Sequence, residues 1–267
     1  MRDLSGVLLA TDLDGTLLGR DHAIPPGSAA AVSRFMRAGG RFTLATGRSL
    51  PGLAHVKPSV PVNAPAVLLN GALVYDYETE ALLYGQPLSP EARALGDILH
   101  RRYPDLGLEI MTLRQKYAVC RNAQIDAHLA YVRCGAMDLE TPGQAPADWY
   151  KLLAVDTPER LRPVGEWLKA EFGDRMQICY SASTLLEIQD MGVDKGAGVA
   201  RVAELTGARE VYCAGDNEND LPMLRAFPSF APANATDACK DAAMAVGPDC
   251  GEDFMAFVIE RIENGPA

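Results

Sequence analysis

The chain of 267 residues has no apolar run that approaches the roughly 18 residues a membrane-spanning helix requires. Its beginning also lacks a basic segment followed by a signal-like apolar stretch, because residues 4–10 continue directly into Asp12. Internal repeats and low-complexity tracts are absent as well. These absences argue against a membrane-spanning or repeat-built protein and favour a globular chain, long enough for one large domain or two modest ones.

Cysteine is scarce, and the six cysteines form no CxxC pair and no zinc-like spacing. Several lie in apolar segments, as buried free thiols do. We therefore expect reduced thiols and a cytoplasmic protein. The four histidines likewise show no metal-ligand spacing, and we assign them no function.

Basic side chains are outnumbered, because 25 Lys and Arg face 35 Asp and Glu and give a net charge of −10. Such a charge argues against nucleic acid and anionic membranes as partners. A small anionic substrate is still compatible, provided that a metal ion and a few basic groups reverse the sign locally. No feature of the sequence indicates an oligomeric state.

The most informative feature that is present is the pentapeptide DLDGT at positions 12–16, which directly follows the apolar residues 7–10. A strand sends residues i and i+2 to the same side, so Asp12 and Asp14 are expected to face one site. Two neighbouring carboxylates repel each other unless a cation or a shared proton intervenes, and Mg²⁺ prefers such oxygen ligands. The alternative is an ordinary surface turn, in which Asp and Gly are common.

A second polar segment, ATGRS at positions 45–49, ends the predicted strand of residues 41–45. The Thr46 hydroxyl and the Gly47 backbone amide suit a phosphate oxygen, because glycine has no Cβ to obstruct a ligand. The alternative role is helix capping by Thr46 or Ser49.

Lys195 precedes a predicted helix over residues 196–205, with Asp194 as the N-cap. A lysine is disfavoured at the positive end of the helix dipole, and a bound anion would offset this. A solvated surface lysine is the alternative.

The loop GDNEND at positions 215–220 follows a predicted strand of residues 211–214 and precedes a helix. It brings Asp216, Asn219 and Asp220 close together. Oxygen-rich metal coordination explains this density of acidic and amide groups. A polar loop with capping residues is the alternative.

Strands alternate with helices along the chain, which predicts an α/β fold with a parallel sheet. Between residues 82 and 187 the pattern changes, so we predict an inserted α+β lid and a discontinuous core domain of residues 1–81 and 188–267. The aromatic residues Tyr117, Trp149 and Tyr180 are expected to pack inside the lid rather than line a ligand pocket. Ligands of open α/β sheets bind outside the carboxyl ends of the strands, where the four polar segments should converge.

In this order, the four segments resemble the signature of the haloacid dehalogenase superfamily of phosphatases, and more narrowly its Cof-type branch with a large inserted C2-type cap. DLDGT resembles the first motif, ATGRS the second, Lys195 in GVDKG the third and GDNENDLPML the fourth. Asn70-Gly71-Ala72 and residues 186–188 also lie where Cof-type sequences have theirs. The resemblance spans nearly the whole chain and implies a Rossmann-like parallel-sheet core with an inserted α+β cap.

The resemblance further implies a Mg²⁺-dependent phosphoric monoester hydrolase that acts on small phosphorylated metabolites, with sugar phosphates as the expected class. Asp12 would be the nucleophile that becomes phosphorylated, and Asp14 the general acid and base. Asp12, Asp216 and the Asp14 backbone carbonyl would hold the metal, and Asp220 would orient water beyond the direct ligands. The groups expected to bind phosphoryl oxygens belong to Thr46, Gly47, Lys195 and Asn219.

Two other functions stay open at the level of sequence. A phosphomutase would use the same nucleophile but pass the phosphoryl group to a second hydroxyl. A non-catalytic phosphosugar-binding or regulatory protein is expected to have lost at least one of Asp12, Asp14, Lys195 or Asp216, and the chain retains all four.

Overall fold

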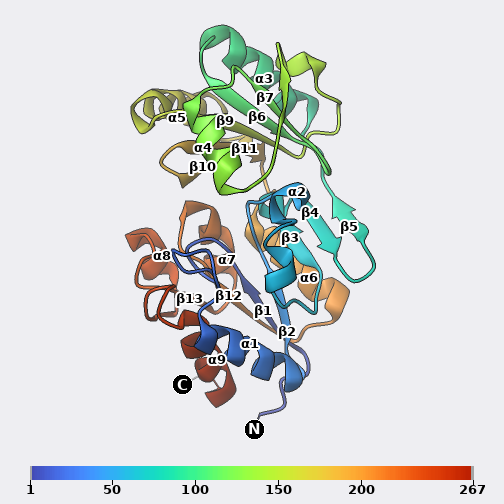
Figure 1. Cartoon of the computed structure of the whole chain (residues 1–267), viewed down its shortest axis with the longest axis vertical. Coiled ribbons are helices and arrows are strands. Elements are labelled where there is room, and N and C mark those ends of the chain that lie inside the picture. Colours follow the sequence, from blue (N-terminus) through green and yellow to red (C-terminus); the bar gives the residue numbers. More distant parts are fainter. Residues whose placement is uncertain (1, 266–267) are drawn as a thin grey trace. The chain divides into compact units, whose positions relative to one another are not determined.

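The computed structural model describes residues 2–265, which group by their internal contacts into two compact units (Figure 1). Within residues 2–265, no helix is both long and apolar enough to cross a membrane. The first unit consists of the described parts of Met1–Thr46, Lys57–Tyr84 and Asp194–Ala267, and the second of Gly47–Val56 and Gly85–Val193.

The first unit is built on a five-stranded sheet of order β14-β13-β12-β1-β2, in which all neighbouring strands pair parallel. Strand β1, which lies between β12 and β2, is buried along its whole length. The predicted α/β fold with a parallel sheet is therefore confirmed. The strands are β1 (Val7–Thr11), β2 (Arg41–Leu44), β12 (Glu210–Ala214), β13 (Ser229–Ala231) and β14 (Ala245–Val246).

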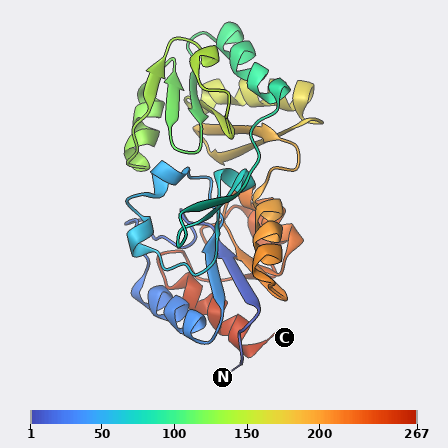
Figure 2. The same cartoon turned by 90° about the vertical axis from the view of Figure 1, so that its right-hand side faces the viewer.

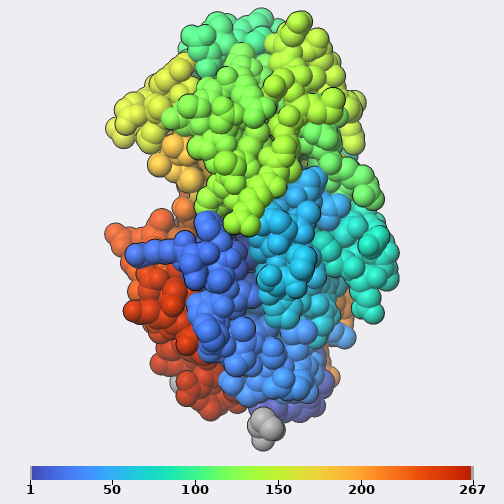
Figure 3. Space-filling view, in the orientation of Figure 1, coloured from blue at the N-terminus to red at the C-terminus, as the bar shows by residue number. Residues whose placement is uncertain are grey.

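Helices cover both faces of this sheet. Side chains alternate between the two faces along β1, and all of them are buried. Leu8 and Ala10 pack in a cluster with residues of α6, α7 and α8. Thr11 faces the other way and contacts Met255 of α9, which packs beside α1. Figure 3 shows the N-terminal and C-terminal segments sharing one surface of this unit. The helices are α1 (Pro26–Arg37), α6 (Lys195–Thr206), α7 (Leu221–Ala226), α8 (Asp237–Ala242) and α9 (Phe254–Asn264).

A small three-stranded sheet, β3-β4-β5, continues the first unit next to β2. A parallel bridge between Ala45 and Val67 connects the two sheets. Strand β5 begins at Ala81 and pairs with β4, so the domain boundary predicted after residue 81 falls inside this strand. The strands are β3 (Ala66–Leu68), β4 (Leu73–Asp76) and β5 (Ala81–Gly85).

The second unit contains a six-stranded sheet of order β10-β11-β9-β6-β7-β8, in which only β7 and β8 pair parallel among the described strands (Figure 2). Helices α3 and α5 pack on one face and form an apolar core that includes Trp149, with Tyr117 and Tyr180 against it. The expected packing role of these aromatics is confirmed. The elements are α3 (Pro90–Arg102), β6 (Gly107–Met111), β7 (Lys116–Val119), α4 (Ala123–Tyr131), β8 (Met137–Leu139), β9 (Lys151–Val155), α5 (Pro158–Phe172), β10 (Met176–Ala182) and β11 (Leu185–Asp190).

Two features of the second unit differ from the predicted domain limits. The boundary predicted after residue 187 falls inside β11, which pairs with β9 and β10 and so belongs wholly to this unit. Gly47–Val56, with the short helix α2 (Leu50–Leu53), was predicted in the core but groups here. The Gly47 carbonyl accepts a hydrogen bond from Lys151 Nζ at 2.9 Å, and the Arg48 guanidinium lies 5.5 Å from the centre of the Tyr131 ring.

Candidate active site

Asp12 lies directly beyond the carboxyl end of β1, where its backbone N–H donates to the Ala214 carbonyl of β12 at 2.8 Å. This bond continues the parallel pairing by one residue and fixes the start of the DLDGT turn. The residue is 8% exposed. A buried carboxylate at a strand end contradicts the alternative of a solvated surface turn.

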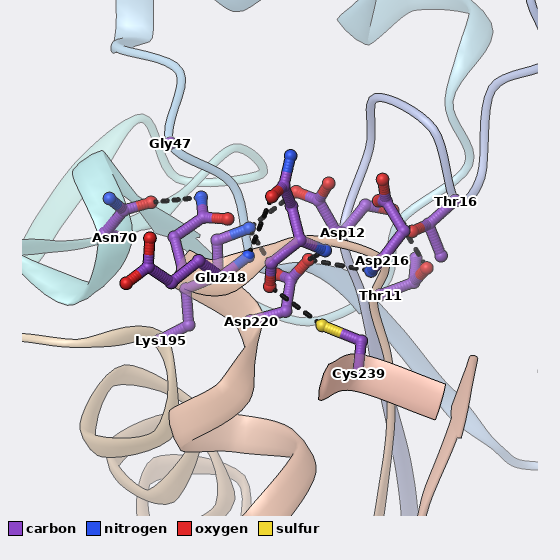
Figure 4. A network of polar contacts seen from close by, with 12 residues as sticks. Thr11, Asp12, Thr16, Gly47, Asn70, Lys195, Asp216, Glu218, Asp220 and Cys239 are labelled. Carbon is purple, nitrogen blue, oxygen red and sulfur yellow. Dashed lines mark hydrogen bonds and ion pairs between the residues drawn. The ribbon is translucent and has the colours of Figure 1, made fainter. Parts of the chain in front are cut away.

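Lys195 is the first residue of α6, and Asp194 caps this helix by accepting from the Ala197 N–H at 2.9 Å, as predicted. The lysine side chain is fully buried, so the alternative of a solvated surface lysine is wrong. Its Nζ donates to Asp12 Oδ1 at 2.7 Å and to Asp220 Oδ1 at 2.6 Å (Figure 4). Burial alone would lower the pKa of Lys195, but these two carboxylates raise it above its ordinary value.

Asp220 organises the loop that follows β12. Its side chain is fully buried, and while Oδ1 accepts from Lys195, Oδ2 accepts from the backbone N–H groups of Asp216 (2.8 Å) and Asn217 (3.0 Å). Gly215 is required here, because a Cβ at that position would lie 2.6 Å from the Asp220 Cβ. The carboxylate of Asp220 therefore holds both the lysine and the loop that carries Asp216.

Thr16 holds Asp216, although no role for Thr16 was predicted from the sequence. Its hydroxyl donates to Asp216 Oδ1 at 2.6 Å across 200 residues of chain. Gly15 allows this approach, since it has a φ of +82° and a Cβ there would lie 2.6 Å from Asp216 Oδ2. The threonine of DLDGT was visible in the sequence, but its partner was not.

Oxygen atoms of Asp12, Asp216 and Asp220 lie within 4.8 Å of one another. Burial raises the pKa of Asp12 well above its usual range, the Lys195 ammonium opposes this, and the neighbouring carboxylates add to it. Burial and the charge of Asp220 raise the pKa of Asp216 to about 7. Three carboxylates against one ammonium leave an excess of negative charge, which a divalent cation would offset, so this donor set fits a hard metal ion.

Asp14 is partly buried and lies outside this cluster of three carboxylates. It nevertheless adds to the negative field at both Asp12 and Asp216. That Asp12 and Asp14 face one site stays a prediction.

Thr46 and Asn219 are buried and meet through Asn70. The Thr46 N–H donates to the Val67 carbonyl (2.9 Å), its carbonyl accepts from the Asn70 N–H (3.0 Å), and Asn219 Nδ2 donates to Asn70 Oδ1 (3.3 Å). Gly47 is different, because it opens the segment that groups with the second unit. Helix capping, the alternative for this stretch, holds for Ser49, which accepts from the Gly52 N–H at the start of α2.

Residues 9–259 match the family model described as haloacid dehalogenase-like hydrolase. A Klebsiella pneumoniae HMP-PP phosphatase is 30% identical over 81% of this chain and 80% of its own. The Escherichia coli pyridoxal phosphate phosphatase YbhA is 26% identical over 96% of this chain and 98% of its own.

A solved structure gives the same picture of the fold. The Thermotoga maritima protein TM0651 superposes with a TM-score of 0.77 at 27% identity, covering 95% of this chain and 96% of that one. The chain belongs to the haloacid dehalogenase-like hydrolase family. It is an enzyme of the phosphatase class within that family, of the Cof type, and the family resemblance and the Rossmann-like core with an inserted α+β cap are confirmed.

Proposed function

We propose that this enzyme is a Mg²⁺-dependent phosphatase that hydrolyses small phosphorylated metabolites, sugar phosphates first among them, through an aspartyl phosphate on Asp12. The observation that carries the proposal is the double contact of the buried Lys195 with Asp12 and Asp220 inside a cluster of three carboxylates. A single lysine–carboxylate pair would be neutral and would need no further ion. Here one ammonium faces three carboxylates, so a bound cation would offset the remaining negative charge.

Asp12, Asp216 and the backbone carbonyl of Asp14 are the proposed metal-binding groups. The raised pKa values of Asp12 and Asp216 support this choice, because burial first and neighbouring carboxylates second disfavour their ionised forms, and a divalent cation would offset this cost. Asp220 is the poorer direct ligand, since Lys195 and two backbone N–H groups already engage its two oxygens. When bound, Mg²⁺ would stabilise negative charge on the phosphoryl oxygens.

In the first step, a carboxylate oxygen of Asp12 attacks phosphorus. Lys195 donates to Oδ1 and thereby fixes the orientation of this carboxylate. The bond from phosphorus to the oxygen of the leaving group breaks, and Asp14 gives its proton to that oxygen, which leaves as an alcohol. Asp14 is thereby converted to a carboxylate, and Asp12 carries the phosphoryl group.

In the second step, water attacks the phosphorus of the aspartyl phosphate. The Asp14 carboxylate removes a proton from this water, the bond from phosphorus to Asp12 breaks, and inorganic phosphate is released. Both carboxyl groups return to their starting states. The hydroxyl of Thr46, the N–H of Gly47, the ammonium of Lys195 and the amide of Asn219 are the proposed donors to the phosphoryl oxygens, and they offset the charge that builds in both steps.

The first experiment measures phosphate release from p-nitrophenyl phosphate with MgCl₂, with EDTA, and after Mg²⁺ is restored. We expect activity that stops with EDTA and returns with the metal. Asp12→Asn should abolish turnover while the protein stays folded. Asp3→Asn is the control, because Asp3 is exposed and its carboxylate accepts from nearby Ser5. Undiminished turnover by Asp12→Asn would refute the mechanism.

A second experiment addresses the substrate. A panel of sugar phosphates is compared with pyridoxal phosphate and HMP-PP, which the names of two relatives suggest. We expect the highest kcat/KM on one group of small phosphate monoesters. Turnover that requires an added bisphosphate, with transfer of the phosphoryl group to a second hydroxyl, would indicate a phosphomutase instead.

A further inference from the structure

The turn Leu69–Gly71, between β3 and β4, has a strained backbone. Leu69, Asn70 and Gly71 have φ values of +47°, +54° and +101°, so three consecutive residues lie in the left-handed region. Glycine adopts it freely and asparagine tolerates it, but for leucine it is costly. Such strain persists only where surrounding structure holds it in place, and it concentrates at functional sites.

This turn contacts three of the loops that carry proposed phosphate-binding groups. The Asn70 N–H donates to the Thr46 carbonyl at 3.0 Å. Asn70 Oδ1 accepts from Asn219 Nδ2 at 3.3 Å, and Figure 4 shows this bond at the Asn70 side chain. A Cβ on Gly71 would lie 2.0 Å from the carbonyl oxygen of Asp194, the residue before Lys195. The turn therefore contacts the backbone of Thr46, the side chain of Asn219 and the backbone of Asp194, each from a different motif.

An ordinary hairpin turn does not explain these contacts. Asn-Gly is common at the tip of a two-stranded hairpin, where both residues accept positive φ and face solvent. Here Asn70 is 3% exposed and Leu69 is fully buried. Asn70 bonds to residues far from it in sequence, and the strain extends to Leu69, which a standard turn of this kind does not require.

The hydrogen bond between Asn70 and Asn219 has a directional consequence. A side-chain amide carries two N–H donors at one end and an acceptor oxygen at the other. Because Asn70 Oδ1 accepts one hydrogen of Asn219 Nδ2, it sets which end of the Asn219 amide is presented, and the second N–H is available to a ligand. If this amide were turned over, its oxygen would face the phosphoryl oxygens and repel them.

We propose that Asn70 is a positioning residue of the phosphate-binding site, which orients the Asn219 amide and fixes the main chain at Thr46. This inference rests on the proposed function and extends it to a residue with no assigned role. Asn70 acts through Asn219 and Thr46 and does not itself need to touch the substrate. Its removal should therefore weaken phosphoryl binding more than metal binding or folding.

The test uses the full-length Asn70→Gly variant, because glycine keeps the left-handed backbone and removes only the acceptor. The probe is orthovanadate, an oxyanion that resembles the phosphoryl group, measured by its inhibition constant and by the rise in Tm that it causes with MgCl₂. We expect roughly tenfold weaker orthovanadate binding and an unchanged Mg²⁺ requirement. Glu80→Gly is the matched control, because Glu80 has the same φ of +54° but lies exposed between β4 and β5.

A double-mutant cycle separates positioning from general support. If Asn70 acts through Asn219, Asn219→Ala combined with Asn70→Gly should bind orthovanadate about as weakly as Asn219→Ala alone. Asn70→Asp retains the acceptor and tolerates positive φ, so Asn219→Ala should weaken orthovanadate binding in the Asn70→Asp variant as much as it does in the wild-type protein. Additive losses in the first cycle would overturn the proposal, as would unchanged orthovanadate binding in Asn70→Gly.

These results also separate the two levels of inference. A wild-type protein that neither releases phosphate nor gains stability from orthovanadate and Mg²⁺ refutes the proposed function, and the role of Asn70 with it. An active wild-type protein with an unaffected Asn70→Gly variant refutes only the role of Asn70.

Discussion

The ammonium of Lys195 lies 2.7 Å from Oδ1 of Asp12, although 183 residues separate them in the chain. The same ammonium also binds Asp220, so one lysine connects the start of the first motif with the end of the fourth. Both lysine contacts are buried. The consequences of this relationship can be measured in stability as well as in activity.

Replacing Lys195 by methionine should destabilise the protein strongly. The variant Lys195→Met leaves Asp12 and Asp220 buried without their cation, and removing one partner of a buried ion pair typically costs about 3–5 kcal/mol. Urea unfolding near neutral pH measures this loss. It should shrink in mildly acidic buffer, because burial already raises the pKa of Asp12 and favours its neutral form. Lys169→Met, at an exposed position of α5, is the control; a loss no larger than in that control would contradict the buried-pair account.

Stabilisation by Mg²⁺ should grow with pH. Burial raises the pKa of Asp12, and burial with the charge of Asp220 raises the pKa of Asp216 to about 7. A carboxyl group with a raised folded-state pKa favours folding in its protonated form, fully so below the unfolded-state pKa. That contribution is lost as pH rises through the folded-state value.

Mg²⁺ binds the ionised carboxylates, so it competes with these protons. The rise in Tm caused by saturating MgCl₂ should therefore be larger at about pH 8 than at about pH 5. Thermal unfolding at both pH values, with and without the metal, makes the comparison. An equal rise at both would show that Asp12 and Asp216 do not bind the ion.

Much of the fold was predictable because its determinants are local. The apolar residues before Asp12 form β1, and Asp194 caps the helix that begins at Lys195. Contacts between segments that are distant in sequence could not be predicted, because they depend on how the strands pair. The hydrogen bond of Thr16 with Asp216, 200 residues away, is an example. Gly47–Val56 groups with the second unit, in which the buried Lys151 donates to the Gly47 carbonyl and to Glu187. Both partners are distant in sequence, so nothing local to Lys151 predicts its burial.

A methyl group at Gly15 should impair metal binding. In Gly15→Ala the Cβ would lie 2.6 Å from Asp216 Oδ2, and the φ of +82° adds backbone strain. We expect a loss of about 1–3 kcal/mol in stability and a roughly tenfold higher Mg²⁺ requirement for activity. Gly207→Ala separates the two effects, because Gly207 has a φ of +64° with nothing within 4 Å of its Cβ position. That control should lose stability alone; equal Mg²⁺ requirements in both variants would contradict the role of Gly15.

Loss of the Thr16 hydroxyl should weaken Mg²⁺ binding strongly and lower the stability of the protein only slightly. Thr16→Val keeps the shape of the side chain but removes the donor that holds Asp216 Oδ1 at 2.6 Å. Loss of a group that orients a metal ligand typically weakens metal binding about 10–100-fold. Activity titrated with MgCl₂ gives this shift directly, and urea unfolding gives the accompanying loss of about 1 kcal/mol.

Thr43→Val is the matched control for Thr16→Val. Thr43 is equally buried, and its hydroxyl donates to the Pro65 carbonyl at 2.7 Å, away from the carboxylates of the site. Both variants lose one buried hydroxyl donor, so their losses of stability should be similar. Only Thr16→Val should need more Mg²⁺, because only Thr16 fixes a carboxylate of the proposed metal site. If both variants respond to Mg²⁺ alike, Asp216 does not depend on Thr16 for its orientation, and the bond between them serves folding alone.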